Sequence, residues 1–365
     1  MHTANSRNPH LSRLCHTPSA ISSSLMTIKD AIAKVAERIS LTEKEAEETM
    51  AEIMEGSTPP AQIAAYLMGL RMKGETVEEI AGSVRAMRAR APKIRVADPL
   101  VVDTCGTGGD CAQTFNISST TAFVVAGGGI TVAKHGNRSV SSKCGSADVL
   151  AALGVKIDIP VELAADCVNE VGLGFFFAPL YHSAMKHCAG VRQELGIRTL
   201  LNILGPLTNP AGATIQVLGV FDGNLTELLA RVLVHLGSQH CFIVHGLDGL
   251  DEMTVTDRTR VSEGKAGVVS SYWIDAGDFG VPRAHPKDLT GGTPDDNARI
   301  VRDILRGKKG PKRDVVCLNA APAFVAAGKV KTLQEGYRLA GRIIDSGAAM
   351  EKLEKLAAFT NRGTS

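Results

Sequence analysis

The sequence lacks the features that would direct it to nucleic acid or to a membrane. Its 40 basic side chains are balanced by 38 acidic ones, so no excess positive charge is available for DNA, RNA or an anionic membrane surface. No apolar run reaches the roughly 20 residues that a membrane helix requires, because residues 121–132, the longest candidate, are interrupted by glycines. We therefore expect no nucleic-acid partner and no membrane segment.

Cysteine pairs and the common nucleotide fingerprints are also missing. The eight cysteines include no CxxC pair, and the histidines do not cluster at zinc-ligand spacing, which favours a reduced, cytoplasmic protein. The P-loop pattern GxxxxGK[ST] occurs nowhere, and Cys111 stands where the dinucleotide fingerprint needs glycine. Dinucleotide cofactors and P-loop nucleotides are disfavoured.

The first 25 residues contain no acidic residue but several basic and serine residues, a composition that resembles a transit peptide. An alternative is that translation begins at Met26, directly before the first periodic segment. We interpret residues 1–26 as an extension that is disordered or not translated, and we expect it to lie outside the fold.

The next part of the chain has the signals of successive helices. Apolar residues recur at helical spacing over residues 28–39, and capping boxes begin at Thr42 and Thr76. Thr58 before Pro59 predicts a helix with threonine as N-cap and proline at its first position. These signals predict a four-helix module that ends near Pro92.

After Pro92 short β-branched runs alternate with glycine turns and helical stretches, which is typical of a mainly parallel sheet flanked by helices. We therefore expect an α/β protein with a small all-helical domain and a large α/β domain. The expected small domain covers residues 27–95 with the helices around 182–204, and the large one covers 96–181 and 205–365. Expected strands are residues 100–104, 130–133, 216–220, 241–245 and 315–318; expected C-terminal helices are 333–344 and 349–356; residues 275–292 are expected to form a long loop.

Two segments have the composition of phosphate-binding loops. GTGGD, residues 106–110, follows an expected strand and precedes a helix, so its glycines expose backbone N–H groups near a helix N-terminus. An ordinary strand-to-helix turn would look similar. KHGNRSVSSKCGSAD, residues 134–148, follows another strand and combines two lysines and an arginine with several serines and two glycines. A solvated surface loop is the alternative, but this density of donors favours a site for a polyanion.

Together, GTGGD and KHGNRSVSSKCGSADVLAALG resemble the signature pair of the anthranilate phosphoribosyltransferases. RQELGIRTLLNILGPLTNP, residues 192–210, is similar to that family's substrate-binding and hinge stretch. Asp251 and Glu252, in HGLDGLDEMT, match its metal-binding acidic pair, and KRDVVCLNAAPAFVAAG, residues 312–328, is similar as well. The resemblance runs from about residue 27 to residue 356.

The resemblance implies an enzyme that transfers the phosphoribosyl group of phosphoribosyl pyrophosphate to the amine of anthranilate in tryptophan biosynthesis. It implies Mg²⁺ as cofactor, with Ser118, Asp251 and Glu252 as its ligands, and Gly106, Asn137 and Arg192 as contacts of anthranilate. Residues implied to bind phosphoribosyl pyrophosphate are Gly106, Gly109, Asp110, Thr114, Asn116, Ile117, Ser118, Ser119, Lys134, His135, Gly136, Asn137, Arg138, Ser139, Ser141, Ser142 and Ser146.

These roles suit the chemistry of the side chains. Mg²⁺ commonly takes one or two carboxylates together with substrate phosphates, although an acidic pair on a loop is, by itself, usually only solvated. Arg192 can present two parallel N–H donors to a planar carboxylate such as that of anthranilate, although a single arginine is more often a surface residue. His135 and His182 are two further candidates, but a lone histidine is more often a structural hydrogen-bonding group than a catalyst, so His135 is expected only as a binder.

No dedicated general base is expected, because the amine of anthranilate is already neutral near pH 7. The tasks left to the protein are to align the two substrates and to stabilise the departing pyrophosphate. The resemblance also implies a site between the two domains, closure that moves Arg192 toward the ribose, and a homodimer formed through the helical domains.

Two other functions are compatible with parts of the pattern. A pyrimidine nucleoside phosphorylase has a related fold and also attacks ribose C1, but the KHGNRS loop, the acidic pair and RQELG disfavour it. A non-catalytic nucleic-acid-binding relative would need a clustered basic surface, which the balanced charge disfavours.

Overall fold

The computed structural model describes residues 26–109, 113–139 and 143–362. The chain begins with a bundle of α1 (Ile28–Ala36), α2 (Glu43–Glu55), α3 (Pro60–Lys73) and α4 (Val77–Arg90). Thr42 and Thr76 cap α2 and α4, each accepting from the backbone of a glutamate three residues on, whose carboxylate accepts from the threonine N–H. The helical module and both capping boxes are therefore confirmed.

Two helix boundaries differ from those expected. The N-cap of α3 is Pro59 and not Thr58, because the Thr58 hydroxyl turns back to donate to the Glu52 carbonyl oxygen of α2. The helix α1 ends at Ala36, and Ile39 lies beyond it with 47% of its surface exposed. Arg38, at φ 60°, breaks the helical path before Ile39, so the apolar spacing does not continue.

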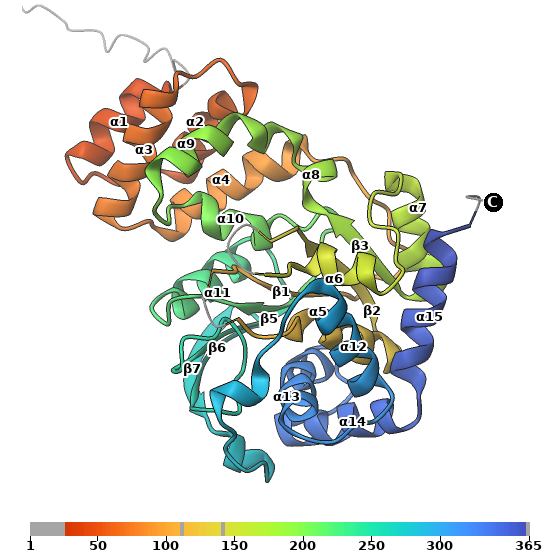
Figure 1. The fold of residues 1–365 in the computed structure, drawn as a ribbon. Coiled ribbons are helices and arrows are strands. Elements are labelled where there is room, and N and C mark those ends of the chain that lie inside the picture. The colour runs from red at the N-terminus through yellow and green to blue at the C-terminus, as the bar shows by residue number, and fades with distance from the viewer. Residues whose placement is uncertain (1–25, 110–112, 140–142, 363–365) are drawn as a thin grey trace, which may run out of the picture.

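A seven-stranded sheet follows, in the order β3-β2-β1-β4-β5-β6-β7. The first five strands in that order are parallel, whereas β6 and β7 are antiparallel. The large part is thus α/β with a mostly parallel mixed sheet, and the small part is helical, as expected (Figure 1). The strands are β1 (Val101–Gly106), β2 (Thr131–Gly136), β3 (Leu173–Phe177), β4 (Ile215–Gly219), β5 (His240–Gly246), β6 (Thr259–Lys265) and β7 (Val268–Ile274).

Both faces of the central strands are buried, which explains their nearly continuous apolar sequences. On β5, Phe242 and Val244 belong to the core shared with α5, whereas Cys241 and Ile243 belong to the core that continues into the helical bundle. The bundle is therefore joined to one face of the sheet by apolar packing. This packing fixes the side of the sheet on which the bundle lies.

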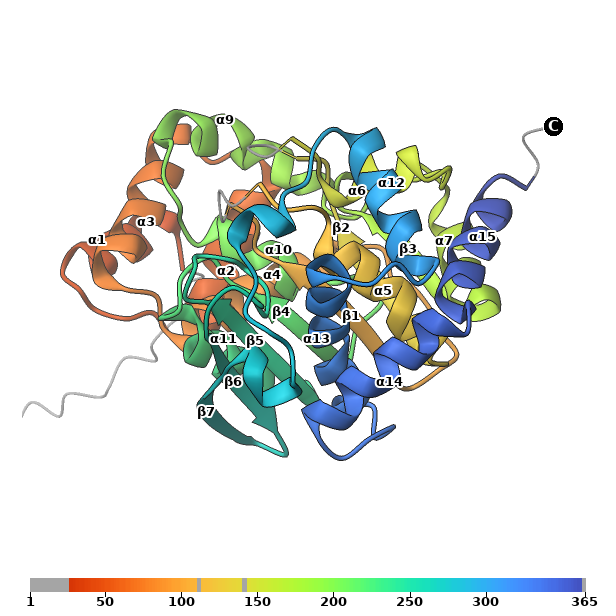
Figure 2. The ribbon, with the colours of Figure 1, turned by 60° about the horizontal axis from the view of Figure 1, so that its bottom comes forward.

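The helices cover the two faces in separate groups (Figures 1 and 2). α5, α13, α14 and α15 pack together on one face, while α11 packs on β5 and β6 and against α4 of the bundle. α9 packs on α3 and α2. The helices after the bundle are α5 (Ile117–Gly127), α6 (Ser146–Ala152), α7 (Val161–Asp166), η1 (Cys167–Val171), α8 (Ala178–Tyr181), η2 (Ser183–Met185), α9 (Lys186–Leu195), α10 (Leu201–Leu207), α11 (Leu225–His235), η3 (Ala276–Phe279), η4 (Pro286–Leu289), α12 (Pro294–Leu305), α13 (Pro311–Ala326), α14 (Leu333–Asp345) and α15 (Ala348–Thr360).

The expected strand at residues 315–318 is wrong, because these residues lie inside α13. A short apolar run fits a buried helix as well as a strand, and α13 is buried from Val315 to Phe324. The remaining expected strands match β1, β2, β4 and β5, but β3, β6 and β7 were not anticipated. The expected loop at 275–292 contains the short 3₁₀ turns η3 and η4 and one isolated bridge residue, Thr290. Across the described ranges, no helix is long and apolar enough to cross a membrane.

A charged contact ties the start of α13 to the end of α14. Arg313 is buried and donates to both carboxylate oxygens of Asp345 at 2.6 and 2.9 Å, and to the carbonyl oxygens of Gly307 and Gly341. The Arg313 hydrogen bonds, together with Lys309, hold the pKa of the Asp345 carboxyl well below its usual range.

We predict that Asp345→Asn lowers the free energy of unfolding at pH 7 by about 1 kcal/mol, because Arg313 loses its anionic partner while Asp345 is half exposed. The lowered pKa means that this stability is present at neutral pH and begins to be lost only below the ordinary aspartate pKa of 3.8, so the difference between wild type and variant should shrink progressively as the pH falls below that value. Urea unfolding across pH measures it. Asp303→Asn, which removes the exposed ion pair with Lys308, should cost less than half as much, and an equal cost would contradict the prediction.

Candidate active site

The carboxyl ends of β1 and β4 mark the point where the strand order reverses. From β1 the chain passes to β2 and β3 on one side, and β4 and β5 lie on the other side. In open α/β sheets this reversal leaves a crevice outside the carboxyl ends, because successive connections diverge there. Both candidate phosphate loops begin at this edge, one after β1 and the other after β2.

The first loop continues β1 through Gly106 to Gly109. Gly108 and Gly109 have φ of +69° and +77°, a left-handed conformation that side chains with a Cβ rarely adopt. The Thr107 N–H donates to the Gly219 carbonyl oxygen, and the Thr107 hydroxyl accepts from the Phe221 N–H, so the loop is anchored to the end of β4. The Gly108 N–H donates to Asp251 Oδ2 at 2.7 Å. The expected residue Asp110 lies outside the described residues.

The start of α5 contributes the second part of this region. The Ser118 N–H, in the first turn of α5, donates to Glu252 Oε1 at 3.0 Å. Asn116 precedes the helix, donates to the Cys144 carbonyl oxygen and accepts from Asn297, which links it to the segment before α6. Thr114 is half-buried and forms an isolated bridge with Thr290.

Two of the expected phosphate contacts point into the protein. The side chain of Ile117 is part of the large-domain core. The hydroxyl of Ser119 is buried and has no hydrogen-bond partner among the described residues. Only the backbone of these two residues is available at the helix N-terminus.

The acidic pair lies on the loop after β5 and reaches both of these elements. Asp251 is 9% exposed and packs into space left by glycines: a Cβ at Gly219 would overlap its carbonyl oxygen, and one at Gly106 would lie 2.5 Å from its Oδ2. Met253, the residue that follows the acidic pair, exchanges two 2.8 Å hydrogen bonds with the buried Asn319 amide of α13. The backbone of the acidic loop is therefore fixed from both sides.

The second loop leaves β2 at Gly136 and returns at α6. The Asn137 N–H donates to the Ser146 hydroxyl, which donates back to the Asn137 carbonyl oxygen. Gly136 is needed here, because a Cβ would meet the Ser146 hydroxyl and the ring of Phe175. Asn137 and Arg138 are exposed. Ser141 and Ser142, also expected to bind phosphate, lie outside the described residues.

Asp148 organises the second loop. Its Oδ2 accepts from the N–H groups of Ser139 and Gly145, at 3.1 and 2.9 Å, and its Oδ1 accepts from Arg138 at 2.8 Å. Burial raises the pKa of Asp148, but these three donors outweigh burial and lower it. Asp148 therefore remains an anion that holds Arg138 and Ser139 close to the start of α6.

Lys134 lies beneath the loops and not on their surface. Its buried ammonium donates to the Thr104 carbonyl oxygen and lies 3.4 Å from the Ser118 hydroxyl. Burial lowers its pKa, and the nearby Asp103 carboxylate opposes that effect. Asp103 is also buried, which raises its pKa to about 6 despite the Lys134 charge and a 2.7 Å hydrogen bond from Asn209. Direct contact of Lys134 with a phosphate would require it to leave these partners.

His135 and His182 form a buried pair. Their rings meet edge to face, with centroids 5.1 Å apart. Burial lowers the pKa of His135 to about 3, with a further contribution from His182, and burial lowers the pKa of His182 to about 4. Both imidazoles are uncharged at neutral pH. The His135 Nε2 atom has no hydrogen-bond partner within the described part of the chain.

Arg192 is exposed on α9, and its side chain makes no hydrogen bond or ion pair with the residues that the structure describes. The structure therefore does not bring it to Gly106 or Asn137, the other two residues expected at anthranilate. Arg198, six residues later, does reach the first loop. Its guanidinium stacks 4.0 Å from the Phe221 ring centroid and donates to the Gly109 carbonyl oxygen.

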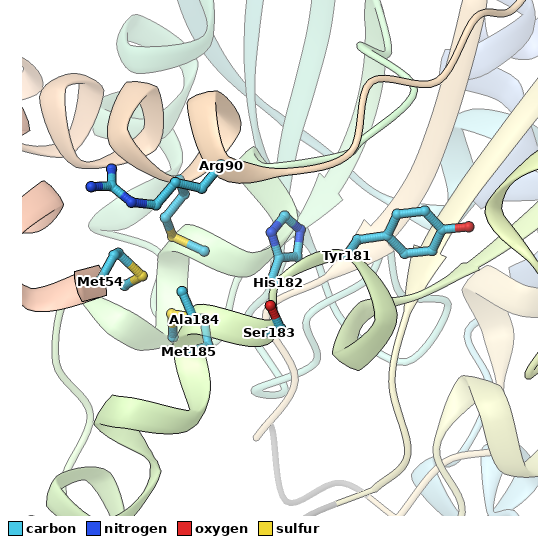
Figure 3. Close-up of a pocket in the computed structure, with 8 residues that line it drawn as sticks. Met54, Arg90, Tyr181, His182, Ser183, Ala184 and Met185 are labelled. Carbon is cyan, nitrogen blue, oxygen red and sulfur yellow. The ribbon is translucent and has the colours of Figure 1, made fainter. Parts of the chain in front are cut away.

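A cavity of about 240 Å³ lies where the bundle meets the segment after β3. Figure 3 shows Met54 and Arg90 of the bundle facing this space together with His182 and Met185, while the Tyr181 ring points away from them. The His182 ring, which lines the cavity, also touches His135 near the end of β2. Its lining residues are Met54, Met87, Arg90, Tyr181, His182, Ser183, Ala184 and Met185.

Sequence patterns did not reveal four residues that hold this region together: Asp103, Asp148, Arg198 and Asn319. Asp148 and Arg198 stood inside segments singled out for their resemblance, but no local signal gave their partners. Asp103 and Asn319 are buried polar residues within apolar runs, which is a recognisable signal, because a buried polar group needs a partner.

Known proteins are similar to this one over nearly the whole chain. Residues 98–350 match the a/b domain of a glycosyl transferase family, and residues 29–91 match the helical bundle domain of a glycosyl transferase family. The anthranilate phosphoribosyltransferase of Desulfosudis oleivorans is 57% identical over 330 residues, which cover 90% of this chain and 97% of that protein.

Two solved structures are similar as well. The anthranilate phosphoribosyltransferase of Thermus thermophilus has a TM-score of 0.87 and 43% identity, covering 91% of this chain and 99% of that one. The Saccharomyces cerevisiae enzyme, solved in complex with PRPP and Mg, has a TM-score of 0.82 and 26% identity, covering 92% of this chain and 98% of that one.

The lowered pKa of His182 predicts a pH dependence of stability. An unfolded histidine takes up a proton as the pH falls below its ordinary pKa of 6.5, but the folded His182 does not do so until about pH 4, so acid favours the unfolded chain. Between pH 7.5 and 5.5 the free energy of unfolding of wild type should fall by about 1 kcal/mol more than that of His182→Gln. Urea unfolding at the two pH values measures the difference.

The exposed residue His285 provides the control, and His285→Gln should behave as wild type does. Equal loss of stability in wild type and His182→Gln would show that His182 is protonated in the folded protein.

Proposed function

The chain belongs to the family of anthranilate phosphoribosyltransferases, and we propose that its two loops, the acidic pair and Arg192 form the active site. It is a pentosyltransferase of tryptophan biosynthesis. The anthranilate amine attacks ribose C1 of 5-phosphoribosyl 1-pyrophosphate, the C1–O bond to pyrophosphate breaks, and the amine loses one proton as N-(5-phosphoribosyl)anthranilate forms. The placement of the site is carried by one observation: the acidic pair contacts the loop after β1 and the start of α5 at a single edge of the sheet.

The phosphates of the substrate are assigned to the donors of the two loops. Backbone N–H groups of the first loop and of the α5 N-terminus can bind anions, and the helix dipole favours negative charge there. The second loop supplies the exposed Arg138 and Asn137 with the hydroxyl groups of Ser139 and Ser146. Lys134 contributes positive charge from its buried position beneath the loops and is not assigned a direct contact with the phosphates.

Asp251, Glu252 and Ser118 fit a Mg²⁺ ion that is carried by the substrate. Among the described residues, no group of three or more histidine, cysteine, aspartate or glutamate side chains could hold a metal by itself. Two adjacent carboxylates beside a hydroxyl are hard oxygen donors that leave the remaining positions to substrate oxygens and water, as Mg²⁺ prefers. When bound there, Mg²⁺ would neutralise charge on the departing pyrophosphate.

The electrostatics support a reaction without a dedicated general base. The pKa of His135 is about 3 and that of His182 about 4, so both are poor proton acceptors at neutral pH. The Asp103 carboxylate is buried inside the sheet and held by Asn209. Catalysis is therefore assigned to the alignment of two bound substrates and to the stabilisation of the leaving group.

We assign the carboxylate of anthranilate to Arg192, which requires α9 to approach the sheet. The exposure of Arg192 and the cavity between the bundle and the segment after β3 are consistent with closure of the bundle over the loops. Gly106 and Asn137 would then face the same ligand from the ends of the neighbouring strands β1 and β2.

The test of function follows the fluorescence of anthranilate in the presence of phosphoribosyl pyrophosphate and Mg²⁺. Wild type should consume it, and Arg192→Ala should raise the KM for anthranilate at least tenfold with little change in the KM for phosphoribosyl pyrophosphate, because a paired contact to a carboxylate is lost.

Lys186→Ala, on another face of α9, is the matched control and should leave both constants unchanged. An inactive wild type would refute the function. An Arg192→Ala variant with an unchanged KM for anthranilate would refute the assignment of Arg192 alone.

We further propose a homodimer formed through the bundles. Met72 on α3 and Ile39 after α1 are 69% and 47% exposed, and burial of such apolar side chains against a second copy would stabilise association. Sedimentation should give twice the chain mass for wild type, and Met72→Glu should shift it toward the monomer. Val268→Glu, a change at an equally exposed residue of β7, should remain dimeric; a monomeric wild type would contradict the proposal.

A cytoplasmic location stays a prediction of the sequence.

A further inference from the structure

The acidic pair occupies two backbone donors of the proposed phosphate site. Asp251 Oδ2 accepts from the Gly108 N–H at 2.7 Å, and Glu252 Oε1 accepts from the Ser118 N–H at 3.0 Å. These two N–H groups belong to separate elements, the first glycine loop and the first turn of α5. One pair of adjacent carboxylates therefore connects the two elements that are assigned to the substrate phosphates.

A phosphate would bind the same donors. The left-handed conformations of Gly108 and Gly109 leave the loop backbone open to an anion, and the N-terminus of the eleven-residue α5 favours negative charge. A carboxylate and a phosphate oxygen cannot both accept from one N–H group in good geometry. A diphosphate that arrives without a cation must displace the carboxylates and is also repelled by their charge.

The replacement of carboxylate by phosphate at these two N–H groups must occur by rotation of the Asp251 and Glu252 side chains, because the backbone of the pair is fixed. The carbonyl oxygen of Asp251 fills the space that a Cβ at Gly219 would occupy, and the backbone of Met253 is held by Asn319. Lys134 already provides one fixed positive charge near both carboxylates, so their rotation away from the amides needs a further positive partner that arrives with the phosphates. A divalent cation carried by the diphosphate is such a partner, because it attracts both carboxylates while the phosphate oxygens take the amides.

We propose that Asp251 and Glu252 have a second role, as specificity-determining residues that exclude the metal-free form of the diphosphate substrate. Their carboxylates close the Gly108 and Ser118 donors to a free polyanion and release them to a metal-bound one. This inference rests on the proposed function. On this account, substrate binding depends on the metal for two reasons. The two carboxylates act as ligands of the metal, and they also compete with the substrate phosphates for the Gly108 and Ser118 N–H groups.

The test measures binding of phosphoribosyl pyrophosphate by calorimetry, once in EDTA and once in Mg²⁺. The protein variants are Asp251→Asn, Glu252→Gln and the double variant, which keep the side-chain shape but remove the charge. In EDTA the double variant should bind about tenfold more tightly than wild type, and each single variant should show part of this gain, because the charge-assisted competition is removed. In Mg²⁺ the order should reverse, with wild type binding more tightly.

Asp222→Asn is the matched control for general electrostatics. Asp222 lies in the loop after β4, next to Phe221, whose N–H donates to Thr107 of the glycine loop, but its own carboxylate accepts from Asn224. This variant removes one negative charge at the same edge of the sheet without freeing the Gly108 or Ser118 donor. It should bind in EDTA as wild type does.

The outcomes separate this inference from the proposed function. If wild type binds in Mg²⁺ but the Asp251 and Glu252 variants gain no affinity in EDTA, the inference is wrong and the proposed function stands. An equal gain in Asp222→Asn would also overturn it, because the effect would then be general repulsion. If wild type fails to bind in Mg²⁺, both are wrong. Circular dichroism and thermal melting identify any variant that does not fold, and the single variants then decide the result.

Discussion

Two carboxylates on one loop hold the proposed substrate-binding elements in register with each other. Asp251 and Glu252 follow β5, yet they contact the loop after β1 and the first turn of α5. The glycines at the ends of β1 and β4 make this possible, because a side chain at Gly106 or Gly219 would fill the space that Asp251 occupies. The rest of the site depends on this close approach of three segments.

The sheet supports this contact from below with buried charge. Lys134 places an ammonium under the carbonyl oxygen of Thr104 and beside Ser118, and the Asp103 carboxylate near it keeps that charge compensated. Buried ions of this kind are costly unless they are paired, and here each of the two charges compensates the other. The positive charge of Lys134 lies near both the acidic pair and the proposed phosphate donors. Positive and negative groups are thus already in place before a substrate is bound.

Sequence patterns predict those helix ends and strands that depend on residues close together in the chain. The capping boxes at Thr42 and Thr76, and the strands β1 and β2, depend on residues close in sequence and are predicted correctly, although β2 extends to Gly136 and so includes the first three residues of the expected loop 134–148. Residues 315–318 were assigned to a strand because a short apolar run does not distinguish a strand from a buried helix. Resemblance, and not spacing, identified Asp251 and Glu252, since an acidic pair on a loop has no specific local signature.

Contacts between distant segments could not be read from the sequence. Asn319 binds the backbone of Met253 from 66 residues away, and Arg198 reaches Gly109 across 89 residues. A crystal structure of this protein with phosphoribosyl pyrophosphate and Mg²⁺ tests the account most directly. We expect phosphate oxygens to accept from the Gly108 and Ser118 N–H groups, with the carboxylates of Asp251 and Glu252 turned to the cation. A complex in which both N–H groups still donate to these carboxylates, while the substrate binds elsewhere, would contradict the account.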